Sequence, residues 1–330
     1  MKNSMDFHTQ KNKILILIGA LLLCALFCVS LFIGKYPLSL WLLMDKDPIQ
    51  LKIFWNLRFC RVFLGCVGGI VLGMSGYIFQ MIFRNPLASP DILGVSSGAS
   101  AGAAVGILFF ANTYAIVICS FTGAIIAVVL ALLFAAVDRS GNKMTVVLAG
   151  IAVHAVAQMV LMLLKGIADP EKELASIEYW IMGGLNGIRT RILWINIPIS
   201  VICLILLLFM HRQSILLSMD EIESKMLGVK VTRVRILLLL LATLAVASVV
   251  SITGIISFVG LLAPHCARKL IKSNQVETMI LSGILGGGFL MIADVLARSV
   301  AQSELPVSVF TSMFGVPFLI LLIVRGRVKE

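Results

Sequence analysis

Long apolar segments separated by short polar ones recur along the whole chain. A helix that crosses a membrane needs roughly 20 predominantly apolar residues, and the pattern predicts ten such spans. The expected spans are 14–34, 61–81, 92–110, 115–136, 144–165, 192–210, 234–253, 255–270, 277–297 and 307–324. Only the Thr253-Gly254 break separates the seventh from the eighth. We therefore expect an all-α, polytopic integral membrane protein with one transmembrane domain over residues 1–330.

The first apolar segment, 14–34, also has some features of a signal peptide. It follows a short polar leader that carries Lys2, Lys11 and Lys13. The segment is long for the apolar part of a signal peptide, and no small-residue cleavage site follows it. We expect it to be a membrane span.

Glycines are concentrated in the second expected span. Gly65, Gly69 and Gly73 are spaced four residues apart, so they share one helix face. Small residues on one face let two membrane helices approach closely. The pattern predicts tight helix packing here, whether or not the same helix also borders a transport pathway.

The composition excludes a soluble globular domain. Hydrophobic residues make up 60% of the chain and charged residues 13%, whereas soluble domains are about 45–50% apolar and about 25% charged. The seven cysteines lie mostly in apolar segments and form no CxxC pair, so we interpret them as reduced, packed side chains.

The formal charge of +11 is explained better by membrane topology than by nucleic-acid binding. The chain has no basic arm and no aromatic platform for nucleic acid. With ten spans and the N-terminus inside, most of the 27 lysines and arginines fall on the inner segments, as the positive-inside rule requires. Both termini are therefore expected in the cytoplasm.

No catalytic or metal-binding motif occurs in the sequence. HExxH, GxSxG and P-loop patterns are absent, and the four histidines, His8, His154, His211 and His265, are isolated from one another. An intramembrane enzyme is therefore disfavoured, and no metal ligand is assigned. Any energy source should come from an ion gradient or from a partner protein.

The polar stretch from Arg84 to Gly102 interrupts the apolar pattern most strongly. Pro86 and Pro90 disfavour a continuous helix, and Asp91 is placed to cap the helix that follows. Irregular backbone is tolerated at membrane depth only where protein or a cavity surrounds it. An ordinary cytoplasmic turn remains an alternative.

This stretch resembles the signature of the iron-siderophore, haem and cobalamin importer permeases, a FecCD/BtuC-like family. The resemblance begins at Gln80-xxx-Arg84-Asn-Pro-Leu-Ala and continues to Leu93-Gly-Val-Ser-Ser-Gly-Ala. Further similar stretches are Leu148-Ala-Gly-Ile, Gly254 to Arg268, and Glu304-Leu-Pro-Val ending in Gly315-Val-Pro-Phe. They follow the family's order across about residues 55–325. The motif or pathway residues implied are Gln80, Asn85, Pro86, Gly94, Ser96 and Gly98.

The resemblance implies a multi-pass permease subunit of a type II ATP-binding-cassette (ABC) importer in a bacterial cell membrane. Such an importer has two ten-helix permeases, which would be two copies of this chain or one copy and a homologous permease. Two cytoplasmic subunits would use ATP and Mg, and an extracytoplasmic protein would bind the substrate. This chain would bind no cofactor itself and would be no enzyme.

The expected cargo is an iron-siderophore complex moved inward by alternating access. A haem, cobalamin or oxyanion importer of the same architecture is the alternative. A gradient-driven secondary transporter would usually need an intramembrane charged relay, and Asp294 is the only carboxylate expected well inside a late span. The pathway is expected to be lined by apolar and small side chains of the second and fifth spans.

The longest polar interruption on the inner side is the segment 217–229. The resemblance implies that it forms short coupling helices that dock into the ATPase. Acidic side chains early in it and Lys225 later suit a helix dipole, although a solvated loop helix would show the same pattern. The implied coupling residues are Asp220, Glu221, Glu223, Leu227 and Gly228.

Arg58 and Arg298 fall at the expected outer ends of spans and resemble the family arginines that pair with acidic residues of the binding protein. A guanidinium group suits such docking because it offers bidentate hydrogen bonds to a carboxylate. Snorkelling arginines are common at span ends, and Asp294, one turn before Arg298, could instead hold it in an intramolecular pair.

Two further positions are implied only by the resemblance. Lys143 and Met144 fall near the family's cytoplasmic gate, where small polar residues would be expected. The outer segment 178–187 resembles a short helix near the mouth of the pathway.

Overall fold

The computed structural model describes residues 2–34, 48–137, 143–188, 190–219, 221–228, 230–272, 276–301 and 303–327. Within these ranges the ordered elements are helices and no strand occurs, so the predicted all-α class is confirmed. The chain divides into two compact units. The first comprises Met1–Met74, Gly184–Thr190 and Ile256–Glu330, and the second comprises Ser75–Gly183 and Arg191–Ile255.

Each of the ten expected spans corresponds to a helix, but only seven of the described helices are long and apolar enough to cross a membrane by length and composition. Those seven are Gln10–Phe32, Leu51–Phe83, Thr113–Val137, Met144–Ile167, Thr190–Phe209, Val231–Thr253 and Val276–Ser299. The apolar helices Val95–Phe110 and Val307–Leu321 are shorter, and the helix for the expected span 255–270 has only 13 residues.

The first unit is built around the helix α14. Its elements are α1 (Lys2–Phe32), α3 (Pro48–Ile53), the π-helix η1 (Phe54–Phe59), the first part of α4 (Cys60–Phe83), α13 (Val259–Ile271), α14 (Val276–Ser299) and α15 (Val307–Arg327). Helix α14 packs against α1, α13 and α15. One buried apolar cluster of this unit joins Leu31 of α1, Val62 of α4 and Met291 of α14.

The glycine face of α4 lies directly against α14. A Cβ atom on Gly69 would approach the Cα of Gly287 to 2.6 Å and would collide with the carbonyl oxygen of Gly286. A Cβ atom on Gly73 would collide with the carbonyl oxygen of Ser282. The predicted close packing is therefore confirmed, and it is backbone against backbone.

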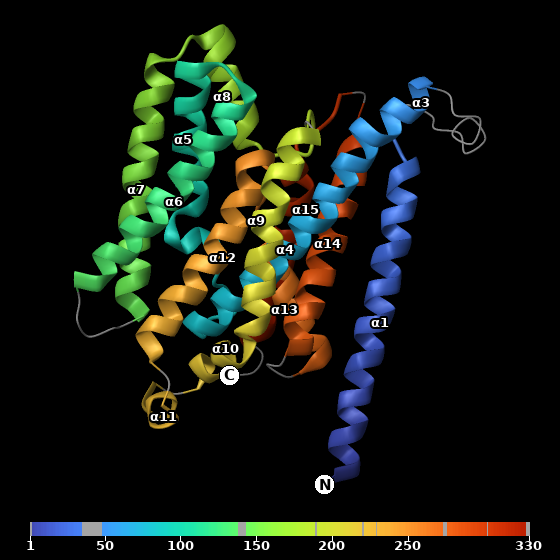
Figure 1. Cartoon of the computed structure of the whole chain (residues 1–330), viewed down its shortest axis with the longest axis vertical. Helices are drawn as coiled ribbons and strands as arrows, with labels where there is room; N and C mark the ends of the chain where they lie inside the picture. The colour runs from blue at the N-terminus through green and yellow to red at the C-terminus, as the bar shows by residue number, and fades with distance from the viewer. Residues whose placement is uncertain are drawn as a thin grey trace. The chain divides into compact units, whose positions relative to one another are not determined.

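The second unit contains the remaining helices. They are α5 (Val95–Phe110), α6 (Thr113–Val137), α7 (Lys143–Ile167), the π-helix η3 (Pro170–Leu174), α8 (Ala175–Ile181), α9 (Thr190–Phe209), α10 (His211–Ser218), α11 (Glu221–Met226) and α12 (Val231–Thr253). Helices α5, α6 and α7 pack on one another, as Figure 1 shows in green. The close approach of α5 to α6 depends on Gly98, which faces Gly123, and on Gly102, which faces Cys119.

Two interruptions explain why α5 and α13 are shorter than the expected spans. Residues Pro90–Leu93 form the 3-10 helix η2, so α5 begins only at Val95. Residues 254–258 are not helical, and Phe258 at the start of α13 has a left-handed φ of 67°. Hydropathy alone places both starts too early, because Ile92 and Leu93 of η2 and most residues of 254–258 are apolar.

Candidate functional site

Three arginines of the first unit, Arg58, Arg61 and Arg298, form a buried group that we call the arginine cluster. Arg58 lies on η1, Arg61 on α4 and Arg298 on α14. All three are less than a tenth exposed. Because buried charges are costly unless they are paired, their partners decide what the cluster can do.

Arg61 holds two carboxylates at once. Its Nε donates to Oδ1 of Asp294 at 2.7 Å, and its Nη1 donates to Oε2 of Glu304 at 2.9 Å. Asp294 belongs to α14, whereas Glu304 lies in the segment before α15. Arg61 therefore ties α4 to two elements that are more than 230 residues away in sequence.

Arg298 is held from two sides. Its Nη2 donates to the carbonyl oxygen of Ser30 at 2.9 Å and to the hydroxyl of the same residue at 2.6 Å. Its Nε lies 3.3 Å from Oδ2 of Asp294. The intramolecular pair considered for Arg298 and Asp294 is thus present, and Asp294 bridges Arg61 and Arg298.

Arg58 donates from Nη1 to the carbonyl oxygen of Ile33, at the end of α1. Its role in docking a binding protein stays a prediction, as does that of Arg298. The sequence reasoning assigned no role to Arg61, although its spacing of three residues from Arg58 places the two on one helix face. Its contacts with Asp294 and Glu304 could not be derived from the sequence.

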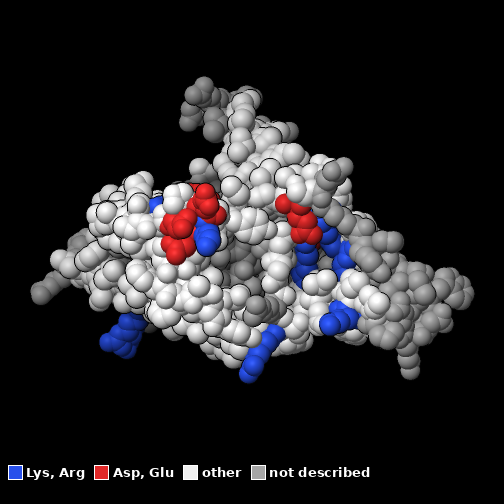
Figure 2. All heavy atoms as spheres, turned by 90° about the horizontal axis from the view of Figure 1, so that it is seen from above, with Lys and Arg blue, Asp and Glu red and all other residues white. Residues whose placement is uncertain are grey.

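The arginine cluster lines a cavity of about 250 Å³ within the first unit. The cavity is lined by Gly34, Ile53, Leu57, Arg58, Arg61, Leu185, Gly187, Ile188, Arg298 and Glu304. Figure 2 shows acidic side chains beside basic ones on the face seen there. At the cavity, Arg61 and Glu304 form an ion pair. The walls thus combine three guanidinium groups with one carboxylate and several apolar side chains.

The polar turn after α4 is not capped as the sequence predicted. Helix α5 has Gly94 as its N-cap, in the left-handed conformation with φ of 77°, and no side chain caps it. Asp91 lies inside η2 instead, and its Oδ1 accepts a hydrogen bond from the hydroxyl of Ser96. The capping prediction for Asp91 was wrong because a 3-10 turn separates Pro90 from α5.

The other motif residues of this turn differ in exposure. Gln80 is buried on α4, with 3% exposure, whereas Asn85 and Pro86 are exposed. The Asn85 side-chain oxygen accepts from the backbone N–H of Leu87 at 2.9 Å, which is an Asx-type turn. Gly98 packs against Gly123 of α6.

Stretches that carry the family resemblance meet in space, each pair within one unit. In the second unit, a Cβ atom on Gly150 of α7 would collide with the carbonyl oxygen of Ile92, and Gly94 lies against Val153 and His154. In the first unit, a Cβ atom on Gly315 would collide with the ring of Phe258. The irregular backbone at 90–94 therefore packs against α7 on one side, while Asp91 is exposed.

The predicted coupling segment, 217–229, contains the short helix α11 and the last two residues of α10. The hydroxyl of Ser224 on α11 donates to the carbonyl oxygen of Leu216 on α10 at 2.6 Å. Glu223, Leu227 and Gly228 are exposed, and Gly228 has a left-handed φ of 78°. Asp220 lies outside the described residues, and only the backbone of Glu221, the first residue of α11, is described.

The two predicted gate residues are the first two residues of α7. Lys143 is its first residue, with a side chain outside the described part, and Met144 is 65% exposed. Among the residues that the structure describes, none encloses the Met144 side chain. The gate stays a prediction.

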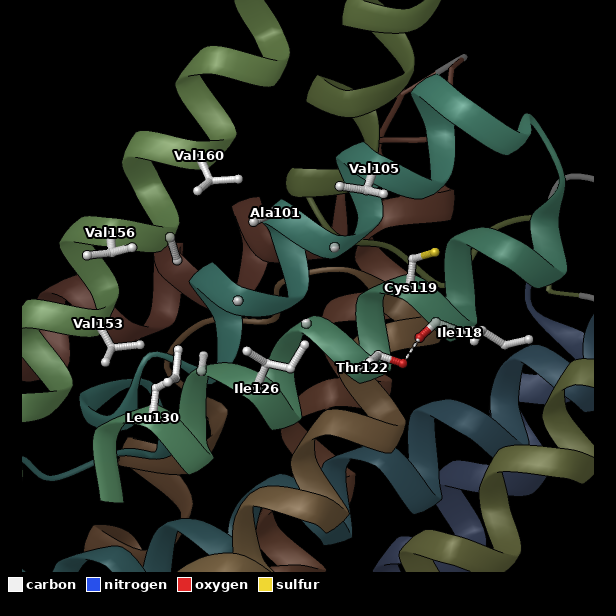
Figure 3. Close-up of a pocket in the computed structure, with 15 residues that line it drawn as sticks. Ala101, Val105, Ile118, Cys119, Thr122, Ile126, Leu130, Val153, Val156 and Val160 are labelled. Carbon is white, nitrogen blue, oxygen red and sulfur yellow. Dashed lines mark hydrogen bonds between the residues drawn. The ribbon is translucent and has the colours of Figure 1, made fainter. Parts of the chain in front are cut away.

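An apolar groove of about 460 Å³ lies between α5, α6 and α7 of the second unit (Figure 3). Val153, Val156 and Val160 of α7 face Ala101 and Val105 of α5 across it. Thr122 of α6 also lines the groove, and its hydroxyl donates to the carbonyl oxygen of Ile118 in the same helix at 2.7 Å. The groove thus involves the third, fourth and fifth expected spans. The pathway expected from the second and fifth spans stays a prediction.

Comparison with known proteins places the chain in a family. The sequence profile of the FecCD transport family matches residues 21–325. The chain belongs to this family. It is therefore a multi-pass membrane protein and a permease of the ABC importers, as the motifs had predicted.

Individual relatives cover almost the whole chain. The molybdate import system permease protein MolB of Haemophilus influenzae is 32% identical over 96% of this chain and 98% of its own length. The hemin transport system permease protein HmuU of Yersinia pestis is 34% identical, covering 88% of each chain. A solved ABC transporter described as of metal-chelate type, in an inward-facing conformation, is 31% identical with a TM-score of 0.87, over 94% of this chain and 99% of that one.

The names of these relatives refer to several kinds of cargo, whereas the sequence-based prediction put an iron-siderophore complex first. They refer to molybdate, to hemin and, for a Pectobacterium atrosepticum permease that is 33% identical over 87% of each chain, to vitamin B12. Membership of the FecCD family therefore does not restrict the cargo to a siderophore. The importer architecture is established, and the chemical class of the cargo is not.

Proposed function

We propose that this chain is the permease subunit that moves a metal chelate, such as an iron-siderophore complex, into the cytoplasm by alternating access. The observation that carries the proposal is the family match across residues 21–325. Transport of this kind changes no covalent bond of the cargo, and the described residues contain no group of metal ligands. The chain would thus supply a path and leave substrate selection to a binding protein.

An oxyanion cargo is the second candidate. It is favoured by the similarity to the molybdate permease, which covers 96% of this chain. Haem and cobalamin remain alternatives within the same architecture. The apolar groove of the second unit offers few hydrogen-bonding groups, so this chain would discriminate weakly among cargoes.

The proposed assembly contains two permeases, two cytoplasmic subunits that use ATP and Mg, and an extracytoplasmic binding protein. Large apolar side chains are exposed along α7, among them Leu148, Met159 and Leu163, and along α15, among them Met313 and Ile320. Exposed apolar faces of this extent suit lipid or a second permease. In this assembly Arg58 and Arg298 would receive a carboxylate of the binding protein.

We propose that α10 and α11 transmit the ATPase cycle. The support is their position between α9 and α12, together with the exposure of Glu223 and Leu227. The exposed carboxylate of Glu223 suits a basic surface on the ATPase. Asp220 and Glu221 would belong to the same docking surface.

The test is uptake into proteoliposomes that contain the chain with its ATPase and binding protein. We expect uptake to require ATP, and we expect Glu223→Lys to lower coupled uptake at least fivefold because it reverses the charge of the docking surface. Glu171→Lys is the matched control, since Glu171 is also exposed but lies on η3. It should leave uptake within twofold of the wild type.

Two outcomes would contradict these proposals separately. Uptake that continues without the ATPase and stops when an ionophore dissipates the ion gradients would identify a secondary transporter. ATP-dependent uptake that Glu223→Lys leaves unchanged would remove the coupling role while retaining the importer.

A further inference from the structure

The apolar groove between α5, α6 and α7 opens to the surface of the second unit. Three of the side chains that line it are more than half exposed, namely Ile118 and Ile126 of α6 and Val156 of α7. Both helices are long and apolar enough to cross a membrane. The groove therefore opens toward the hydrocarbon of a membrane or toward an apolar surface of another chain.

The interior of the groove offers almost nothing to a polar ligand. Among the fifteen described residues that line it, only Cys119 and Thr122 carry a polar side-chain atom. The Thr122 hydroxyl already donates to the carbonyl oxygen of Ile118. Water does not fill such a space, because a water molecule needs two or more hydrogen-bond partners. An apolar occupant is favoured, since bare walls lose the van der Waals contacts of a packed interior.

The dimensions of the groove decide between a helix and a single hydrocarbon chain. On α6 the lining residues run from Ile118 to Leu130, a length of about 18 Å at 1.5 Å per residue. A helix of that length and about 10 Å in diameter fills roughly 1,400 Å³, whereas the groove has about 460 Å³. A methylene group needs about the volume of a water molecule, about 30 Å³, so the groove holds about fifteen of them. This capacity matches one long acyl chain.

Small residues of α5 form the floor of the groove. Gly98 and Gly102 bring α5 so close to α6 that a Cβ atom on either would collide with backbone atoms of α6. Helix α7 forms the opposite wall, where Val153 and Val160 face Ala101 (Figure 3). A hydrocarbon chain in the groove would thus contact three helices at once, whereas a lipid on a convex helix surface contacts only that surface.

We propose that the apolar groove of the second unit binds one acyl chain of a membrane phospholipid along α6. The bound chain completes the packing of α7 against α5 and α6. None of the described lining residues is charged, so the groove recognises the acyl chain and its length, and not the headgroup. The inference concerns the second unit alone and does not depend on the proposed transport function.

The first experiment counts the lipid that the purified full-length chain retains, by native mass spectrometry after detergent washes that remove loosely held lipid. We expect one phospholipid for each wild-type chain. Ala101→Phe divides the groove, because Ala101 lies between Gly98 and Val105 on its floor, and should lower retention at least tenfold. Ala101→Leu adds a smaller side chain, tests the same position if Ala101→Phe does not fold, and should lower retention at least threefold.

Ala155→Phe is the matched control. Ala155 is exposed on α7 but does not line the groove, so the same aromatic side chain is added outside the site. Its retention of lipid should stay within twofold of the wild type.

The second experiment uses the length of the acyl chain. The delipidated wild-type chain in detergent is titrated with palmitoyl or octanoyl lysophosphatidylcholine while thermal unfolding is followed. A ligand that binds only the folded state raises the unfolding temperature. We expect a rise of several degrees with the palmitoyl lipid and less than half of that rise with the octanoyl lipid, which is too short to fill the groove. The palmitoyl effect should be lost in Ala101→Phe and kept in Ala155→Phe.

Other occupants of the groove would give other results. Loss of retained lipid in the Ala101 variants, with retention in Ala155→Phe, supports the proposal. Equal retention in the wild type and in the folded Ala101 variants would overturn it, as would a wild-type chain that retains no lipid and shows no palmitoyl effect. Ala101 variants that separate a dimer into single chains, with bound lipid unchanged, would instead identify the groove as a contact between two copies.

Discussion

Glycine residues set the distance between α4 and α14 in the first unit. The Cβ that any other residue would bring to position 69 meets backbone atoms of Gly286 and Gly287, which cannot rotate away as a side chain could. The approach is therefore closer than side chains would allow. It also brings Arg61 of α4 within 2.7 Å of Asp294 on α14, so this packing supports the arginine cluster.

Gly69→Ala tests this packing. We expect a loss of stability of about 1–3 kcal/mol, the usual cost of overpacking a filled interior, measured as a lower thermal unfolding midpoint in detergent. Gly288→Ala is the control, because nothing lies within 4 Å of a Cβ at that glycine of α14. An unchanged midpoint for Gly69→Ala would show that the two helices separate without cost.

At the scale of single residues, the sequence predicted what local spacing determines. The four-residue spacing of Gly65, Gly69 and Gly73 was sufficient to predict a close helix contact. The partners of Arg61 were not predictable, because the contacts span more than 230 residues and depend on how α4 and α14 pack. The left-handed conformation of Phe258, whose ring packs against Gly315, was also not predictable from the sequence.

A buried side-chain hydrogen bond joins the short helices α10 and α11. Ser224 is buried, with 1% exposure, and its hydroxyl reaches across eight residues to the carbonyl oxygen of Leu216. Gly228 after α11 adopts a left-handed φ of 78° that glycine accepts without strain. These two features give a fixed geometry to a pair of helices that are individually too short to be stable.

Ser224→Ala should loosen α11 from α10 without unfolding the chain. The loss of one hydrogen bond of about 1 kcal/mol is expected to increase hydrogen exchange of the α11 amides severalfold while the global unfolding midpoint changes little. Ser218→Ala is the control, because the Ser218 hydroxyl bonds to Ile215 within α10. Equal exchange in both variants would show that the Ser224 contact does not hold α11.

The positions of the helices were largely predictable from hydropathy, and their exact starts were not. Apolar length located a helix at each of the ten expected spans. It placed the start of the third span at residue 92 and that of the eighth at residue 255, whereas α5 begins at Val95 and α13 at Val259. Ile92 and Leu93 of η2 and most of the non-helical residues 254–258 are apolar, so hydropathy extends both spans over residues that are not part of α5 or α13.

The whole molecule was predictable as a permease but not as a carrier of a particular cargo. The family motifs lie where irregular backbone meets a neighbouring helix, as at Gly150 and Ile92, so they preserve architecture. The apolar groove contains no charged side chain that would select a ligand. The motifs therefore predict the importer fold. The relatives that share this fold differ in the cargo that their names state.

The orientation of the chain in the membrane is a prediction that follows from the distribution of basic residues. With the N-terminus inside, η3 should face outward, and the segment that contains α10 and α11 should face the cytoplasm. Lys172 on η3 and Leu227 after α11 are both exposed. They therefore provide one reporter position for each side of the membrane.

Cysteine labelling in intact cells tests this orientation. In Lys172→Cys a membrane-impermeant maleimide should react at once, whereas in Leu227→Cys it should react only after the cells are permeabilised. The wild-type chain serves as the blank for its seven native cysteines. The reverse pattern would place α10 and α11 outside the cell, out of reach of any cytoplasmic ATPase, and would contradict both the orientation and the coupling proposal.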